Sequence, residues 1–211
     1  MKKISPAEVA KSAAGARRPT RQEAEAAVRT LLAWAGDDPE REGLKETPRR
    51  VAEAYEEYFG GYGQDAIALL QEPTFREVGG YDDLIILRGV RVESHCEHHI
   101  APFVGVAHVA YLPSRTVAGL SKLARVVDVF AKRLQTQEAL TAQIADAIDR
   151  ALTPRGVAVM VEAEHHCIAT RGVQQAGVAA ITTRFLGAFE TDSQMRERFL
   201  AIAQASRGHG Q

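Results

Sequence analysis

The spacing of hydrophobic residues changes along the chain from a helical period to an alternating one and back. In residues 20–36 and 47–60, apolar side chains recur every three or four positions, which predicts two amphipathic helices. Thr20 and Glu23 form a capping box at the start of the first helix. Trp34 falls at helical spacing within it, so we expect this side chain in the core.

Alternation with a period of two predicts strands in four later segments, namely 84–94, 104–112, 157–169 and 179–189. Between the two pairs of strands, the helical period returns in residues 119–134 and 137–152. Thr191 and Gln194 suggest a capping box that opens a C-terminal helix. This order predicts an α+β fold in which antiparallel hairpins flank a helical crossover.

The length of 211 residues, at ~150 residues per domain, suggests one domain with an N-terminal extension. Residues 1–19 are rich in Lys, Arg, Ala and Ser, which is typical of a flexible tail. We therefore predict a tail over 1–19, a helical segment over 20–61 and the main domain over 62–211.

The composition excludes several classes of protein. Hydrophobic residues make up 45% and charged residues 25%, which excludes a collagen-like or disordered chain. Lys and Arg number 26 against 27 Asp and Glu, so the chain lacks the basic excess of a nucleic-acid binder. We expect no nucleic-acid partner, and any anionic ligand must be held by a local basic cluster.

No apolar run approaches the ~20 residues that span a bilayer, so we expect no membrane association. No hydrophobic stretch of the kind found in signal peptides follows the first lysines, so we expect a cytoplasmic protein with reduced thiols. In such a compartment, the two cysteines are more often metal ligands or catalytic groups than a disulfide.

Histidines and both cysteines gather in two short segments. Cys96 and His99 are three residues apart between the first two predicted strands, so they can converge on one ion in a tight turn. In the third predicted strand, alternation places His165 and Cys167 on one face and turns His166 away. The spacing of His95 also directs its side chain away from this group.

Two thiolates and one imidazole suit Zn²⁺. His98 or His165 could complete a closed four-ligand site, or could stand beside an open site as an acid or base. The residues alone leave this choice open.

Five segments, in order, resemble the GTP cyclohydrolase I family. They are Glu46-Thr47-Pro48-Arg49-Arg50-Val51-Ala52, Cys96-Glu97-His98-His99, Gly119-Leu120-Ser121-Lys122-Leu123-Ala124-Arg125, Gln135-Thr136-Gln137-Glu138, and His165-His166-Cys167 with Arg171-Gly172. The resemblance covers roughly residues 22–200. The family hydrolyses GTP to formate and 7,8-dihydroneopterin triphosphate, the first step toward folate and related pteridines.

The resemblance implies a role for each matching residue. Its zinc ligands correspond to Cys96, His99 and Cys167, and a water in the fourth position attacks C8 of guanine. Its two acid/base histidines correspond to His98 and His165.

The family's guanine-binding positions fall on Glu138 and Gln137. Its phosphate-binding positions fall on Ser121, Lys122, Arg125, Arg171 and Arg50. The chain departs from the family at residues 178–180, where Val-Ala-Ala replaces a polar stretch.

The resemblance further implies a tunnelling fold, with an antiparallel four-stranded sheet, helices on one face and an N-terminal helical extension. It also implies a homodecamer of two pentamers with active sites between subunits. A zinc-stabilised protein without turnover is one alternative, although it would need neither His98, His165 nor Glu138. The other is a related enzyme of this fold, which would use a different nucleophile or three metal-binding histidines.

Overall fold

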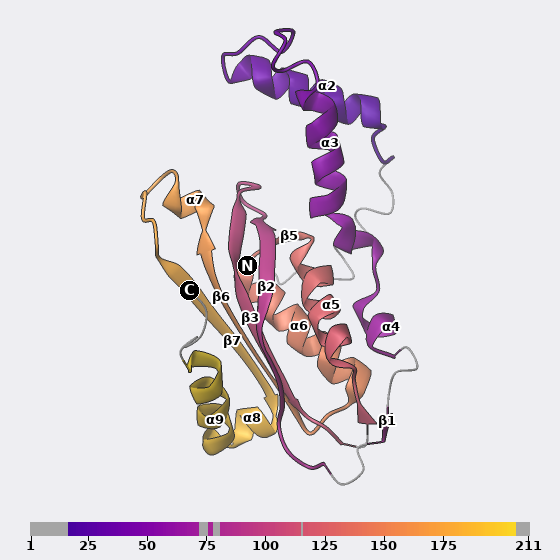
Figure 1. Cartoon of the computed structure of the whole chain (residues 1–211), viewed down its shortest axis with the longest axis vertical. Coiled ribbons are helices and arrows are strands. Elements are labelled where there is room, and N and C mark those ends of the chain that lie inside the picture. The colour runs from indigo at the N-terminus through magenta and orange to yellow at the C-terminus, as the bar shows by residue number, and fades with distance from the viewer. Residues whose placement is uncertain (1–16, 72–75, 78–80, 115, 206–211) are drawn as a thin grey trace. The chain divides into compact units, whose positions relative to one another are not determined.

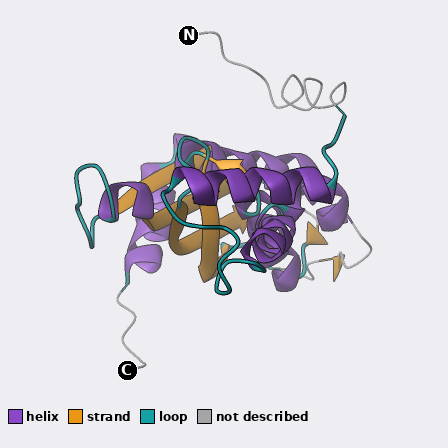
Figure 2. Cartoon of the chain, turned by 90° about the horizontal axis from the view of Figure 1, so that it is seen from above, coloured by secondary structure: helices purple, strands orange, loops and turns teal. Residues whose placement is uncertain are grey.

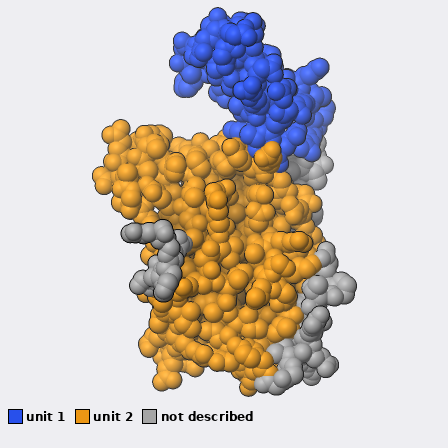
Figure 3. Space-filling view, in the orientation of Figure 1, with its two compact units in different colours: residues 1–56 blue, residues 57–211 orange. Residues whose placement is uncertain are grey.

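The computed structural model describes residues 17–71, 76–77, 81–114 and 116–205. The chain divides into two compact units, Met1–Glu56 and Glu57–Gln211, which are coloured separately in Figure 3. This boundary lies five residues before the one that we expected between 61 and 62, and the functional division into domains stays a prediction. The expected tail over 1–19 lies mostly outside the described residues, and each unit is described below by itself.

The first unit contains α2 (Arg21–Trp34) and most of α3 (Thr47–Tyr58). The capping box is confirmed, because Thr20 accepts from the backbone of Glu23 and the Glu23 carboxylate accepts from the backbone of Thr20. The prediction for Trp34 was wrong, since its side chain is 85% exposed. The half-buried stripe of α2 runs through Val28 and Leu32, and Trp34 lies ~200° around the helix from Leu32.

The second unit carries the remaining elements, whose order is visible in Figure 1. Its helices are η1 (Gly60–Gly63), α4 (Ala66–Gln71), α5 (Leu120–Ala131), α6 (Gln137–Leu152), α7 (His166–Ala169), α8 (Ala188–Thr191) and α9 (Ser193–Gln204). Its strands are β1 (Arg76–Glu77), β2 (Ile85–Cys96), β3 (Pro102–Leu112), β4 (Thr116–Val117), β5 (Leu134–Gln135), β6 (Gly156–His165) and β7 (Ala179–Gly187). The predicted α+β class is confirmed.

The main sheet has five strands in the order β5-β2-β3-β6-β7, and β1 and β4 form a separate pair. The four long strands pair antiparallel, as the hairpins predicted. The fifth strand, β5, runs parallel to β2, so the sheet is mixed and the prediction of a four-stranded antiparallel sheet was incomplete. A strand of two residues is too short to show an alternating pattern in the sequence.

Helices pack on both faces of the sheet, which corrects the expectation of helices on one face. On one face, α4, α5 and α6 bury side chains such as Leu70, Leu123 and Ile144 against β2, β3 and β6. On the other face, Phe189 of α8 and Phe199 of α9 cover Met160. Figure 1 labels these helices along the twisted sheet, and Figure 2 shows the strands of the sheet in orange from above.

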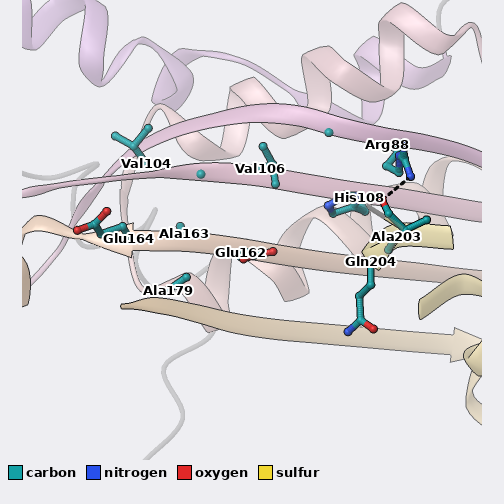
Figure 4. Close-up of a pocket in the computed structure, with 13 residues that line it drawn as sticks. Arg88, Val104, Val106, His108, Glu162, Ala163, Glu164, Ala179, Ala203 and Gln204 are labelled. Carbon is teal, nitrogen blue, oxygen red and sulfur yellow. Dashed lines mark hydrogen bonds between the residues drawn. The ribbon is translucent and has the colours of Figure 1, made fainter. Parts of the chain in front are cut away.

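Beyond α9, the second face carries a hollow of about 650 Å³ (Figure 4). Its lining includes Val104 and His108 from β3, and Glu162 and Glu164 from β6. Arg88 closes one side by donating to the backbone oxygens of Ile202 and Ala205 at 3.0 Å. The hollow therefore lies on the sheet face opposite α5 and α6.

The end of β6 and the start of α9 differ from their predicted positions because of local structure. β6 ends at His165, and the next residues turn into α7, so Cys167 does not continue the strand as we expected. The cap of α9 is Asp192, which accepts from the backbone of Gln194 and Met195, because Thr191 ends α8. Among the described residues, no helix has both the length and the apolar character needed to cross a bilayer.

Candidate metal and active site

The turn between β2 and β3 brings Cys96 and His99 together. The backbone of Ile100 donates to the Cys96 oxygen, and that of Cys96 donates to the Ala101 oxygen, both at 2.9 Å. Ile100 adopts a φ of 52°, a conformation that is strained for a β-branched residue. The Cys96 Sγ and His99 Nδ1 atoms lie 3.9 Å apart as a result. The predicted convergence across three residues is confirmed.

Cys167 reaches the same place from the single turn of α7. One ligand atom from each of Cys96, His99 and Cys167 lies within 4.8 Å of the others. Two thiolates on one tetrahedral zinc ion would be about 3.8 Å apart, given Zn–S bonds of about 2.3 Å. The donor set and its spacing therefore fit a metal ion such as zinc after a small contraction. Both cysteines are free thiols rather than a disulfide.

Without a cation, this pocket favours protonated sulfur. Burial and the neighbouring Cys96 thiol raise the pKa of the Cys167 thiol above its usual range, and Arg171 opposes this effect. A divalent cation between the two sulfurs would reverse that balance, because metal ligation requires the thiolate form. Binding of a metal ion here would thus be coupled to the release of protons.

The short strand β5 places the start of α6 beside the triad. Cys96 is the register partner of Gln135, and the backbone of Glu97 donates to the Gln135 oxygen at 2.9 Å. Thr136 then caps α6 by accepting from the backbone of Ala139. Gln137 and Glu138 consequently occupy the first turn of α6, next to the end of β2.

His165, at the end of β6, is held on two sides. Its ring stacks on Phe103, the directly opposite residue of β3, with centroids 4.6 Å apart and planes 9° from parallel. Its Nε2 atom lies 2.8 Å from Oε1 of Gln137. Burial lowers the pKa of His165, and the negative charge of Glu138 partly opposes this effect. The imidazole is therefore fixed in place and biased toward its neutral form.

The other predicted residues are spread over several elements. His98 is exposed in the β2–β3 turn, with Nε2 4.0 Å from a Glu97 carboxylate oxygen. Glu138 is exposed on α6. The predicted phosphate-binding set comprises Ser121 and Arg125, exposed on α5, Lys122, buried on the same helix, Arg171, exposed after α7, and Arg50, exposed on α3 in the first unit.

Sequence reasoning missed three contributors to this site. Phe103 supports the His165 ring, and Thr141 and Thr182 bond to each other beside Gln137. None of them belongs to a recognisable motif. His95 packs against the rings of Tyr58 and Phe59, with centroids 4.6 and 5.4 Å away. The candidate metal-binding group consists of Cys96, His99 and Cys167 and does not include His95.

Comparison with known proteins gives a consistent result. A family model described as GTP cyclohydrolase I matches residues 24–204. The protein named GTP cyclohydrolase 1 from Hyphomonas neptunium is 62% identical over 184 residues, which cover 87% of this chain and 89% of that protein. Its namesake from Maricaulis maris is 58% identical over 187 residues, covering 89% and 91%. The solved structure of the archaeosine synthase QueF-Like aligns with 51% of this chain and 96% of its own, at 19% identity and a TM-score of 0.39.

Proposed function

Because the chain belongs to the GTP cyclohydrolase I family, we propose that it hydrolyses GTP to formate and 7,8-dihydroneopterin triphosphate. The observation that carries this proposal is the convergence of Cys96, His99 and Cys167 beside His165. A metal site without catalytic activity would need Cys96, His99 and Cys167, and it would not need His165. Because 7,8-dihydroneopterin triphosphate is a pteridine, this reaction would be the first step toward folate and related pteridines.

The metal we propose is zinc, held by the two thiolates and the His99 imidazole. When bound, zinc supplies Lewis acidity that activates water near neutral pH. The three protein ligands match the number found in catalytic zinc sites, in which one position stays open. The thiolates and the imidazole would hold the ion, and the surrounding residues would transfer protons and bind the substrate.

His165 is suited to move a proton at the guanine ring. Its burial favours the neutral imidazole, which can accept a proton and later return it. Stacking on Phe103 and the bond to Gln137 keep the ring in one orientation. His98, exposed in the neighbouring turn, is the second candidate for proton transfer.

Glu138 is the proposed reader of guanine. Its carboxylate can accept hydrogen bonds from N1–H and the 2-amino group, which adenine does not present together. The side chain is exposed in the first turn of α6, where the helix dipole favours a negative charge. The exposure leaves the carboxylate available to a ligand.

The proposed triphosphate site uses basic and hydroxyl side chains from α5, from the segment after α7 and from α3. Arginine and lysine match phosphate oxygens in charge and hydrogen-bonding capacity. The site consists of Ser121, Lys122, Arg125, Arg171 and Arg50. We propose that these residues meet through assembly, with active sites between subunits.

For the whole protein we propose a tunnelling fold assembled as a decamer of two pentamers. The edge strand β7 supports this, because most of its side chains are exposed, with Ile181 at 56%. An open strand edge is prone to pairing with another chain. Pairing between copies would cover β7.

The direct test is to incubate the purified full-length protein with GTP. We expect equimolar formate and a product that becomes a fluorescent pterin after oxidation. GTP consumed without formate would contradict the proposed reaction, and GTP left unchanged by a metal-loaded protein would contradict any turnover.

A further inference from the structure

The amide of Gln137 is fully engaged by the protein around it. Gln137 is 2% exposed, although it stands in the first turn of α6. Its Nε2 atom has three acceptors for its two protons, which are the backbone oxygens of Val161 at 3.0 Å and Ala180 at 2.9 Å and Oγ1 of Thr182 at 3.2 Å. Two of these three partners are backbone oxygens, which can only accept.

A short chain of hydroxyl groups fixes the direction of the third contact. Thr141 Oγ1 donates to the backbone oxygen of Gln137 at 2.8 Å, which uses its only proton. The Thr182 hydroxyl, 2.6 Å from that of Thr141, must then donate to it. Thr182 is therefore left to accept from Nε2 of Gln137. All three contacts require the amide nitrogen of Gln137 on this side.

The orientation of the amide determines the tautomer of His165. With the Gln137 nitrogen directed at β6 and β7, Oε1 is the atom that faces His165 Nε2 at 2.8 Å. A carbonyl oxygen only accepts, so Nε2 must carry a proton. In the neutral imidazole, the lone pair then resides on Nδ1. The same hydrogen bond persists when Nδ1 gains a proton.

We propose that Gln137 is a positioning residue that holds neutral His165 in its Nε2–H tautomer, so that the ring lone pair lies on Nδ1. This inference rests on the proposed function for its catalytic consequence, but the tautomer itself does not. It reassigns Gln137, which the family resemblance implies to contact guanine. Both polar atoms of its side chain already have partners within the chain.

The tautomer can be measured on the unmodified protein. Solid-state ¹⁵N spectra of sedimented, histidine-labelled protein distinguish a bare ring nitrogen from a protonated one. The chain has seven histidines, and the His165 signals are identified by their loss in His165→Ala. We expect a bare Nδ1 and a protonated Nε2 for neutral His165. A protonated Nδ1 with a bare Nε2 would overturn the proposal, whatever reaction the protein catalyses.

The consequence for turnover is tested with Gln137→Met, which keeps the volume and removes both polar atoms. We expect kcat for GTP to fall roughly tenfold to a hundredfold, the usual effect of losing a group that orients a functional histidine. KM should change less than about threefold. Both neutral tautomers of His165 should be populated in this variant. A large rise in KM with kcat retained would instead make Gln137 a guanine contact and contradict the proposal.

Gln135→Met is the matched control. Gln135 is also 2% exposed, and its amide donates to the Phe130 backbone oxygen and to Gln143 rather than to a histidine. The control therefore removes an equally buried amide two residues away. We expect kcat to stay within about threefold of the wild type and the His165 spectrum to be unchanged. An equal loss of kcat in both variants would mean that Gln137 has only a structural role.

Discussion

At the scale of single residues, the site divides into groups set by local spacing and groups set by long-range contacts. The sequence predicted the pair Cys96 and His99, because a turn of three residues brings such neighbours together. The network of Gln137 could not be predicted, since its partners Ala180 and Thr182 are 43 and 45 residues away along the chain. The core position of Trp34 was predicted from the helical repeat of apolar residues alone. That repeat does not show which side of the helix is buried.

A first prediction concerns His165. His165→Ala removes the proposed proton-transfer group and leaves Cys96, His99 and Cys167 in place. We expect zinc content and GTP binding to be retained, with formate release slowed ~10²-fold or more. The measurement is metal analysis together with single-turnover formate release. Loss of zinc from this variant would instead make His165 a fourth ligand of a closed site.

A second prediction concerns Glu138. Glu138→Gln keeps the shape and turns one acceptor into a donor that faces a guanine donor. We expect a loss of at least ~3 kcal/mol in kcat/KM for GTP, because a charged hydrogen bond is replaced by a clash of donors. Steady-state kinetics with GTP, inosine triphosphate and ATP should place inosine triphosphate between the other two in the wild type.

Glu190→Gln provides the control for that experiment, because the same change falls on an exposed residue of α8. It should leave the order and rates of the three nucleotides unchanged. If Glu138→Gln behaved like this control, Glu138 would be an ordinary carboxylate at a helix start, and guanine would be read by another group.

At the scale of elements, the periodic segments were predicted well and the short ones were not. The range of α6 was predicted to the residue, and β3 to within two residues, because both carry a long and regular pattern. β5 and α7 escaped prediction because two or four residues cannot show a period. These two elements bring α6 and Cys167 to the β2–β3 turn, so the site depends on the least predictable parts of the fold.

A third prediction concerns the attachment of α9 near the start of β2. Arg198 forms two hydrogen bonds with the Asp83 carboxylate, at 2.7 and 2.8 Å, and holds the pKa of Asp83 at about 2. A carboxylate with a lowered pKa stabilises the fold fully above its unfolded pKa of about 3.9 and progressively less as the pH falls toward 2. We expect the urea midpoint of Asp83→Asn to fall below the wild type at pH 7, and the difference to shrink between pH 4 and 2.

Arg198→Gln removes the same pair from the other side. Its midpoint should shift in the same direction, and the double variant should lose less than the sum of the two single variants. A difference between wild type and Asp83→Asn that stays constant down to pH 2 would show that the ion pair contributes nothing to the folded state.

At the scale of the whole molecule, the residues assigned to one substrate do not all belong to one compact unit. Arg50 lies in the first unit, whereas the candidate metal-binding group lies in the second. The sequence predicted this set only through the family resemblance, because neither spacing nor period relates α3 to α7. The expectation of helices on one face also came from the family resemblance, and it was wrong because α8 and α9 cover the second face. The hydrophobic pattern could not correct it, since this pattern shows that a helix is amphipathic and not which sheet face it covers.

A fourth prediction concerns assembly. The exposed edge of β7 and the distribution of the proposed phosphate-binding residues predict an oligomer, and the family resemblance implies that it is a decamer. Sedimentation velocity at concentrations used for assays should show this particle, with activity that follows it upon dilution. Full activity in a monomeric fraction would contradict a site shared between chains.

The central claim is that the Cys96, His99 and Cys167 group binds the metal on which GTP hydrolysis depends. Its most direct test is formate release from GTP by chelator-treated protein during titration with zinc, with bound metal measured in each sample. We predict no formate without metal and a linear rise that saturates at one zinc per chain. We also predict that Cys167→Ser will recover neither bound zinc nor activity. Full formate release by the metal-free protein, or by Cys167→Ser, would contradict the account.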